Sequence, residues 1–264
     1  MEQEQFDKTF SLTFGDVAEN HKGMQQIGTL SDKVFDYKDL VQMKRWFEER
    51  GAVCNIVHLH WLLSDVEAQK GNKAYVLKVK NAVNILLEDE HGADHLFEEQ
   101  DVLEKDTKAI MYGRVVNKKA RHNLCFSDEH QDPDYEAGKG TVYSFEEVPL
   151  LQRIRQRLGE VIGEQGADLQ AEGNYYYDIH KCGIGFHGDT ERKKVIAFRL
   201  GATIPLCYTW FHKNKNVSDI LTVAGLDHGD MYVMSEKSTG YDWKSSSKYT
   251  LRHSAGCDKF TSIK

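Results

Sequence analysis

The sequence predicts an α+β protein whose second half is a mostly antiparallel β core of the sandwich or jelly-roll kind. After Gly173, short apolar and β-branched segments recur at regular spacing with turn residues between them, as in double-sheet β folds. One strongly amphipathic helix is expected at 148–162, just before this β region. Of the 264 residues, 40% are hydrophobic and 11% aromatic, so a sizeable core can form. This composition disfavours disordered and fibrous classes.

Residues 1–105 are expected to form a mixed α/β extension of unknown role. A helix is expected at 37–50, because Leu40, Met43 and Phe47 recur at helical spacing. The other segments expected here are a weak strand at 10–14, a strand or buried segment at 53–63, a segment of either type at 74–87, and an acidic, exposed stretch at 88–108.

Residues 106–264 are expected to form a second domain. A strand at 110–116 leads into a basic run, and the acidic, turn-rich stretch at 127–140 predicts a mobile loop. The apolar face of the helix at 148–162 consists of Leu151, Ile154, Leu158 and Ile162. The strands expected after it are 174–177, 195–200, 204–211, 219–223, 231–234, 249–252 and 260–263.

The strongest local feature for chemistry is His187-Gly188-Asp189, at the expected end of a strand. A His and an Asp two residues apart can place an imidazole and a carboxylate on one metal ion. With a second, distal His they form the two-His, one-carboxylate triad of non-haem iron(II) oxygenases. A loop histidine beside a surface acid is the alternative interpretation of so short a motif.

The segments 174–177, 187–189, 195–201 and 226–234, in this order, resemble the Fe(II)- and 2-oxoglutarate-dependent dioxygenases of the AlkB-like branch. The resemblance extends over 109–264. It implies a double-stranded β-helix (jelly roll) core with flanking helices, and a substrate-recognition lid at 109–147. It also implies Fe(II), 2-oxoglutarate and O₂ as cofactor and cosubstrates, and oxidation of a substrate C–H bond with release of succinate and CO₂.

The resemblance requires a distal histidine to complete the iron site. His253 lies 66 residues after His187, a plausible distance for this ligand in the family. The family's usual pattern falls instead close to Trp243, so Asp242 is the alternative ligand. We therefore expect His187, Asp189 and His253 to hold iron.

The resemblance also implies residues that hold 2-oxoglutarate. Tyr177 matches the family tyrosine that hydrogen-bonds the cosubstrate. The family places a basic residue on its last strand for the far carboxylate, and Lys259 and Lys264 border the strand expected at 260–263. Arg199 is a further candidate for this carboxylate, with a structural ion pair as its alternative role.

A basic cluster upstream of the core is the candidate substrate-binding element. It consists of Lys118, Lys119, Arg121 and His122. These side chains are expected to contact phosphates at the mouth of the site, with a solvated surface turn as the alternative. The expected substrate is an alkylated or methylated base in single-stranded DNA or RNA, flipped into the pocket. A hydroxylase of a protein side chain or small metabolite, and an iron-free jelly-roll binding module, are the alternatives.

Charge and hydropathy exclude several other classes of protein. The formal charge is -7, which excludes a surface coated in positive charge for non-specific nucleic-acid binding. Five widely spaced cysteines predict free thiols and no disulfide framework. No apolar run approaches the ~20 residues that span a bilayer, and no signal-peptide pattern opens the chain. A cytoplasmic or nuclear protein is expected, neither secreted nor bound to a membrane.

Overall fold

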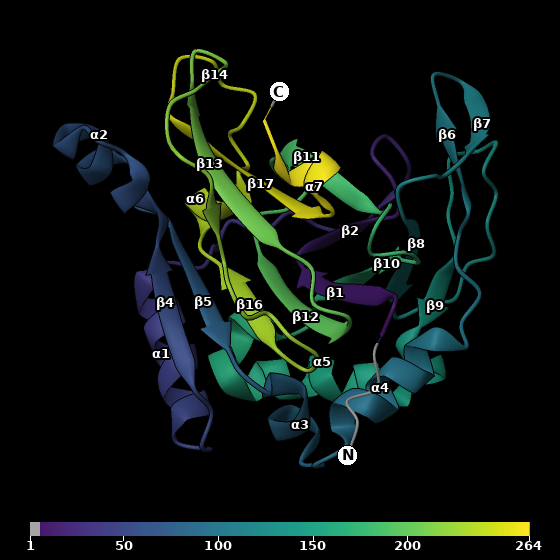
Figure 1. The fold of residues 1–264 in the computed structure, drawn as a ribbon. Coiled ribbons are helices and arrows are strands. Elements are labelled where there is room, and N and C mark those ends of the chain that lie inside the picture. The colour runs from purple at the N-terminus through teal and green to yellow at the C-terminus, as the bar shows by residue number, and fades with distance from the viewer. Residues whose placement is uncertain (1–5, 264) are drawn as a thin grey trace.

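The structure, a computed structural model, describes residues 6–263 and is built around one large β-sheet (Figure 1). Neighbouring strands of this sheet are antiparallel, except for β8 and β9. In spatial order its strands are β4 (Cys54–His58), β5 (Tyr75–Val79), β16 (Met231–Met234), β12 (Val195–Gly201), β1 (Thr9–Gly15), β10 (Gln170–Tyr176), β8 (His122–Ser127) and β9 (Val142–Ser144).

A second, smaller antiparallel sheet packs on one face of the large sheet, and two hairpins are paired with neither sheet. The second sheet consists of β11 (Gly183–His187), β17 (Thr250–Gly256), β13 (Leu206–His212), β14 (Lys215–Asn216) and β15 (Leu221–Thr222). The hairpins pair β2 (Val17–Glu19) with β3 (Gln26–Gly28), and β6 (Lys108–Met111) with β7 (Arg114–Asn117). The prediction of an α+β protein made mostly of antiparallel strands is confirmed.

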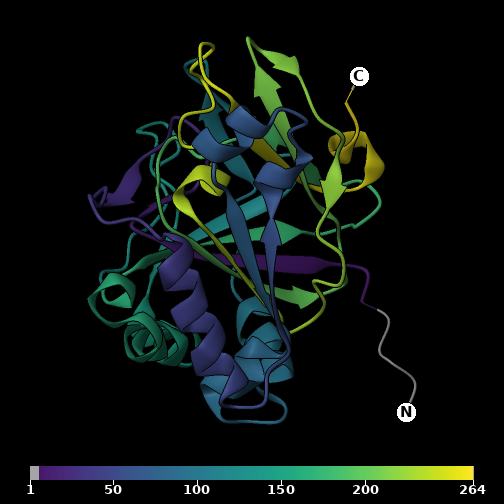
Figure 2. The ribbon, with the colours of Figure 1, turned by 90° about the vertical axis from the view of Figure 1, so that its left-hand side faces the viewer.

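Helices cover the other face of the large sheet (Figures 1 and 2). The α-helices are α1 (Tyr37–Glu48), α2 (Val66–Gly71), α3 (Ala82–Leu87), α4 (Gly92–Asp101), α5 (Pro149–Ile162), α6 (Glu236–Thr239) and α7 (Asp258–Thr261). Short 3₁₀ turns lie at Leu59–Leu62, Phe145–Glu147 and Gly163–Gly166. None of the helices within residues 6–263 has the length and apolar character needed to cross a membrane.

The two faces of the large sheet therefore bury two different cores. On the helical side, Phe14 and Phe198 of the sheet pack in one cluster with Leu151 of α5. This is the apolar helix face that the sequence predicts at 148–162. On the other side, Tyr232 of the large sheet clusters with Trp210 of the second sheet. The candidate site lies on this second side, between the sheets.

Strand β1 comes from the segment expected to be an extension, yet it lies inside the large sheet. It pairs antiparallel with β10 on one side and β12 on the other, and all seven of its residues are buried. Strands β4 and β5 also come from this segment, and β5 pairs with β16. The large sheet thus runs across the boundary expected near residue 105 and unites both parts of the chain in one layer.

Three expected elements differ in the structure. The single strand expected at 110–116 is instead a hairpin, because the chain turns at Tyr112 and Gly113 between β6 and β7. The strand expected at 260–263 is wrong, because 258–261 form α7, and Phe260 packs against Gly183 of β11. Strand β17 already has β11 and β13 as neighbours, so no free edge remains beside it for a further strand. The stretch 88–108, expected to be exposed, contains α4, which buries Leu96 against the sheet.

Candidate metal centre

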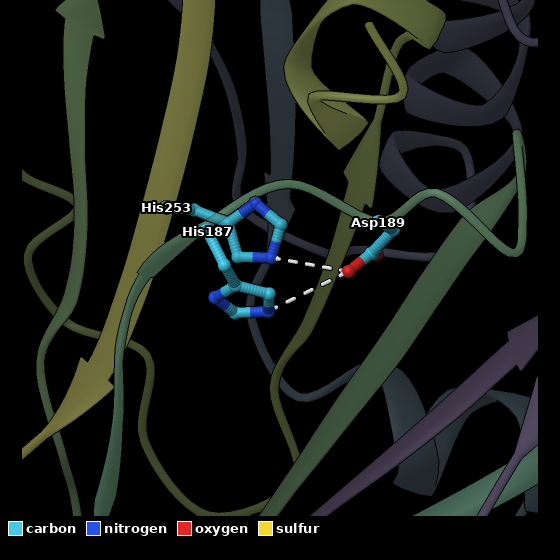
Figure 3. A group of neighbouring side chains, drawn as sticks. All are labelled: His187, Asp189 and His253. Carbon is cyan, nitrogen blue, oxygen red and sulfur yellow. Dashed lines mark ion pairs between the residues drawn. The ribbon is translucent and has the colours of Figure 1, made fainter. Parts of the chain in front are cut away.

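Three side chains that could hold a metal ion meet where the end of β11 lies beside the middle of β17 (Figure 3). The Oδ1 atom of Asp189 lies 3.6 Å from Nε2 of His187 and 3.6 Å from Nε2 of His253. The two imidazole rings are 4.4 Å apart between centroids. One ligand atom from each residue lies within 4.8 Å of the others. The structure therefore brings together the three residues expected from the sequence.

Strand pairing and a tight turn position these three side chains. His187 and His253 are directly opposite each other on neighbouring antiparallel strands, so their side chains project from the same face. The chain then turns at Gly188, where a Cβ atom would collide with the carbonyl oxygen of Gly240. The amide of Asp189 donates to the carbonyl of Thr239 at 2.9 Å, which directs the carboxylate back toward the histidines.

Burial shifts the protonation of all three side chains toward their neutral forms. It lowers the pKa of His187 to about 4 and holds the pKa of His253 well below its usual value. Both imidazoles are therefore neutral near pH 7. Burial, together with the nearby Glu191 carboxylate, raises the pKa of Asp189 well above its ordinary range. A cation between the three side chains would stabilise the carboxylate form.

The hydrogen bonding of His187 also indicates that a cation fits between the three side chains. Its Nδ1 atom lies 2.8 Å from the carbonyl oxygen of Gly185, which can only accept, so Nδ1 carries the proton. Nε2 of the neutral ring is then a lone-pair acceptor and faces another acceptor, Oδ1 of Asp189, at 3.6 Å. Two acceptors turned toward each other need a proton or a cation between them. The donor set of two imidazoles and one carboxylate suits Fe(II).

A cavity of about 240 Å³ opens beside the three ligands, between the two sheets. Its wall includes Arg199 of β12 and Ser11 of β1, which are paired in register. Arg199 is only 1% exposed. Its Nε and Nη1 atoms have no hydrogen-bond partner among the described residues. Because a buried charged group is normally paired, the guanidinium of Arg199 lacks the partner that its burial calls for.

A second buried arginine on the cavity wall is fully paired instead. Arg192, 3% exposed, donates from Nη2 to Glu172 and, at 3.0 Å, to Glu191. The two carboxylates hold the pKa of Arg192 well above its usual value, although burial alone would lower it. This network neutralises acidic charge close to Asp189. No motif marks Arg192 as part of the site, and it stands among three consecutive basic residues after the metal motif.

The other expected cosubstrate ligands lie away from the cavity. The hydroxyl of Tyr177 donates to the carbonyl of Lys119 at 2.7 Å, and the preceding Tyr176 lines the cavity instead. Lys259 is on α7, where it borders a separate surface hollow. Lys264 lies outside the described residues. Asp242, the alternative metal ligand, pairs with Lys237 at 2.8 Å.

The expected basic cluster is divided between interior and surface. Burial lowers the pKa of Lys118 to about 8, and its amine donates to Asn20 at 2.6 Å. Arg121 lines the cavity, with Nε donating to Asn174 at 2.6 Å. The ring of His122 stacks on Tyr177 with centroids 4.6 Å apart.

The first part of the chain also supplies residues that the sequence analysis did not assign to the site. Ser11 and Thr13 of β1 form part of the cavity wall, and the loop after β2 adds Asn20 and Lys22. No local motif marks these residues, because they reach the cavity only through the pairing of β1 with strands far away in the chain.

No family model matches the chain. Its sequence is 47% identical over 253 residues to an uncharacterised protein of Acanthamoeba polyphaga mimivirus, and this match covers 96% of the chain and 97% of the viral protein. A match of this strength across both full lengths shows common descent. The chain belongs to the same family as this mimivirus protein.

Proposed function

We propose that this protein is an Fe(II)- and 2-oxoglutarate-dependent dioxygenase that oxidises a C–H bond of its substrate. The observation that carries the proposal is a pair of complementary sites on one cavity. His187, Asp189 and His253 form a three-ligand set for iron that leaves positions open. On the same cavity wall, Arg199 presents two buried donors without partners, as an anionic cosubstrate requires.

The strand arrangement supports a double-stranded β-helix for this protein. From β10 to β17 the chain alternates between the large and the second sheet, with β13–β15 counted as one step. By that alternation, a strand after β17 would return to the large sheet. In the large sheet, the position between β10 and β12 is occupied by β1. We propose that β1 fills the position that a strand after β17 would otherwise take.

Because β1 takes this place in the sheet, the basic residue that would pair with 2-oxoglutarate comes from a different strand. The resemblance implies a basic residue on the last strand, but 258–261 are helical and Lys259 lies outside the cavity. Strand β1, which occupies the corresponding position, contributes Ser11 and Thr13 to the cavity wall and no Lys or Arg. Arg199 on β12, opposite Ser11 in register, supplies the positive charge at this place.

In the proposed reaction, this chain binds and orients the reactants and controls charge. His187, Asp189 and His253 would hold the metal, and Arg199 would pair with the far carboxylate of 2-oxoglutarate. Bound iron supplies the oxidative decarboxylation of 2-oxoglutarate by O₂, which couples release of succinate and CO₂ to oxidation of the substrate. Arg192 offsets one of the two negative charges of Glu172 and Glu191. The remaining charge, together with Asp189, would match the double positive charge of Fe(II).

The substrate group would enter through the polar mouth of the cavity. Glu19, Asn20, Lys22 and Trp243 line the cavity, and the amine of Lys22 lies 5.6 Å from the Trp243 ring centroid. The guanidinium of Arg121 is anchored through Nε alone, which leaves its terminal nitrogens to bind an incoming acceptor. These groups match the polar edge of a modified base better than an apolar side chain.

The experiment is a decarboxylation assay on protein reconstituted anaerobically with Fe(II), with release of labelled CO₂ from 2-oxoglutarate as the readout. Wild type should bind one iron per chain and release CO₂ even without a substrate, because uncoupled turnover is expected when iron and cosubstrate are both bound. His187→Ala should abolish both, whereas Asp242→Ala should abolish neither. Iron-free protein without turnover, correctly folded by circular dichroism, would instead establish the binding-module alternative.

A further inference from the structure

An exposed cluster of positive charge lies on two neighbouring loops at one end of the second sheet. Two of its members lie in the β13–β14 turn and at the start of β14, two in the loop between α6 and β17, and the fifth on β17. Lys213 donates its amide to the carbonyl of Ser246 at 3.0 Å, so the two loops are in contact. Figure 1 shows them side by side beyond the end of β13. The members are Lys213, Lys215, Lys244, Lys248 and Arg252, here called the β13–β17 patch.

The positive charge of the β13–β17 patch is not neutralised within the described part of the chain. The four lysines are exposed, and no carboxylate of residues 6–263 forms an ion pair with any of the five cations. Elsewhere many cations are paired, as Lys80 is with Asp227 and Lys237 is with Asp242. In a protein of net charge -7, five unpaired cations on adjoining loops form a local site for a polyanion.

Aromatic side chains are interleaved with these cations. The Arg252 guanidinium carbon lies 3.8 Å from the ring centroid of Phe211 and 5.1 Å from that of Trp243. His212 stacks on Tyr249 with centroids 4.3 Å apart and an angle of 13° between the rings. Cations along a backbone path with stacked rings between them are typical of surfaces that bind single-stranded nucleic acid. An acidic peptide offers carboxylates but no flat bases to stack.

The β13–β17 patch also adjoins the entrance of the cavity. Trp243, which contacts Arg252, lines the cavity beside Gly188 of the metal motif. On its other side, the amine of Lys22 lies 5.6 Å from the Trp243 ring centroid. A strand that follows the patch therefore reaches the mouth of the cavity at Trp243. In the cluster expected for this role, the amine of Lys118 is engaged by Asn20 and the ring of His122 stacks on Tyr177.

We propose that the β13–β17 patch binds the phosphate backbone of single-stranded nucleic acid and directs one base into the cavity. The binding step stands on the charge and ring geometry of the patch, and only the oxidation of the base rests on the proposed dioxygenase function. Patch lysines contact phosphates, which gives affinity without sequence preference. Readout of the base is left to the mouth of the cavity.

The test is fluorescence anisotropy with a fluorescein-labelled oligothymidylate of about 20 nucleotides, titrated at several salt concentrations. The patch variant replaces Lys213, Lys215, Lys244 and Lys248 by Gln. The control variant replaces Lys33, Lys38, Lys70 and Lys73 by Gln; these are exposed residues near α1 and α2, so both variants have the same net charge. Each phosphate contact on a single strand contributes about 0.7 to the slope of log affinity against log salt, so the patch variant should lose about 2.8 of that slope.

Loss of affinity and slope in the patch variant alone supports the proposal. Equal loss in both variants would show that only net charge matters and would overturn it, as would failure of wild type to bind the oligonucleotide. Displacement by polyglutamate as effective as by unlabelled oligothymidylate would mark the patch as an acidic-protein site and overturn it too. If the fourfold variant does not fold, Lys213→Gln with Lys215→Gln should show half the slope change.

Uncoupled 2-oxoglutarate turnover, measured on the same proteins, separates this proposal from the proposed function. The patch variant should retain it, because none of its four lysines lies on the cavity. Oligonucleotide binding by a wild type that shows no turnover would leave the patch in place and remove the dioxygenase function. Turnover without oligonucleotide binding would overturn the patch proposal and leave the dioxygenase function in place.

Discussion

Replacing Arg199 by methionine should separate cosubstrate binding from folding. The Nε and Nη1 atoms of Arg199 are buried without partners among residues 6–263. A buried polar group left unpaired costs ~1–3 kcal/mol, so these two nitrogens together destabilise the ligand-free protein by ~2–6 kcal/mol. Methionine fills the space with a flexible apolar chain. Ligand-free Arg199→Met should therefore be at least as stable as wild type, with Tm raised by about 2–4 °C for each kcal/mol gained.

The same substitution should remove most of the affinity for 2-oxoglutarate. Hydrogen bonds to a charged group contribute ~1.5–3 kcal/mol each, so the loss of two amounts to ~3–6 kcal/mol. Since 1.4 kcal/mol is a factor of ten, the KM for 2-oxoglutarate in the decarboxylation assay should rise by at least ~100-fold. Calorimetric unfolding with and without 2-oxoglutarate gives an independent measurement, because the cosubstrate should raise the Tm of wild type and leave that of Arg199→Met unchanged.

Arg192→Met is the matched control, since Arg192 is equally buried but paired with Glu172 and Glu191. Removing one partner of a buried ion pair leaves uncompensated charge and costs ~3–5 kcal/mol. This variant should therefore be clearly destabilised. If Arg199→Met is destabilised as much as Arg192→Met and keeps the wild-type KM, Arg199 is a structural residue and its assignment to the cosubstrate is wrong.

Three further predictions concern the metal ligands, pH and the N-terminal strand. His253→Ala should lose bound iron and Asp242→Ala should keep it, as measured by metal analysis; the reverse result would make Asp242 the third ligand. Because the pKa of His187 is about 4 in the folded protein against an ordinary 6.5, the unfolded chain takes up the proton first as pH falls. The stabilising contribution of neutral His187 is then complete above pH 6.5 and is lost toward pH 4. Urea unfolding of metal-free His187→Gln should show a weaker pH dependence in this window, and an unchanged dependence would contradict the assigned pKa. A fragment of residues 106–264 should fail to fold by circular dichroism, since it lacks β1, and a stable fragment would show that β1 is dispensable.

Local patterns account for the parts of the molecule that could be predicted from the sequence. Helix α5 was predictable because its apolar positions recur at helical spacing and fill one side of the core. His187 and Asp189 form a local motif, so their proximity follows from two residues of chain. His253 was predictable only through the family's spacing, and the structure places it opposite His187 on the next strand.

The parts that could not be predicted depend on pairing between distant segments. The stretch 10–14 shows a weak strand pattern, but this pattern does not predict that its partners are β10 and β12, more than 150 residues away. The alternation at 260–263 fits a strand, but β17 has no free edge to pair with it. The buried amine of Lys118 follows from Asn20, which lies 98 residues earlier in the chain.

The central position of β1 bears both on the strand wrongly predicted at 260–263 and on which residue supplies positive charge to the cavity. A β-sheet position filled by the N-terminal strand cannot also receive a C-terminal strand, and Lys259 on α7 does not line the cavity. For the proposed cosubstrate, the positive charge would then come from a strand that flanks β1, where Arg199 on β12 lines the cavity opposite Ser11. A buried arginine without a partner destabilises the ligand-free fold, and the neighbouring Arg192 shows that this fold can pair such a charge. The unpaired donors of Arg199 are therefore best explained by a ligand that completes them.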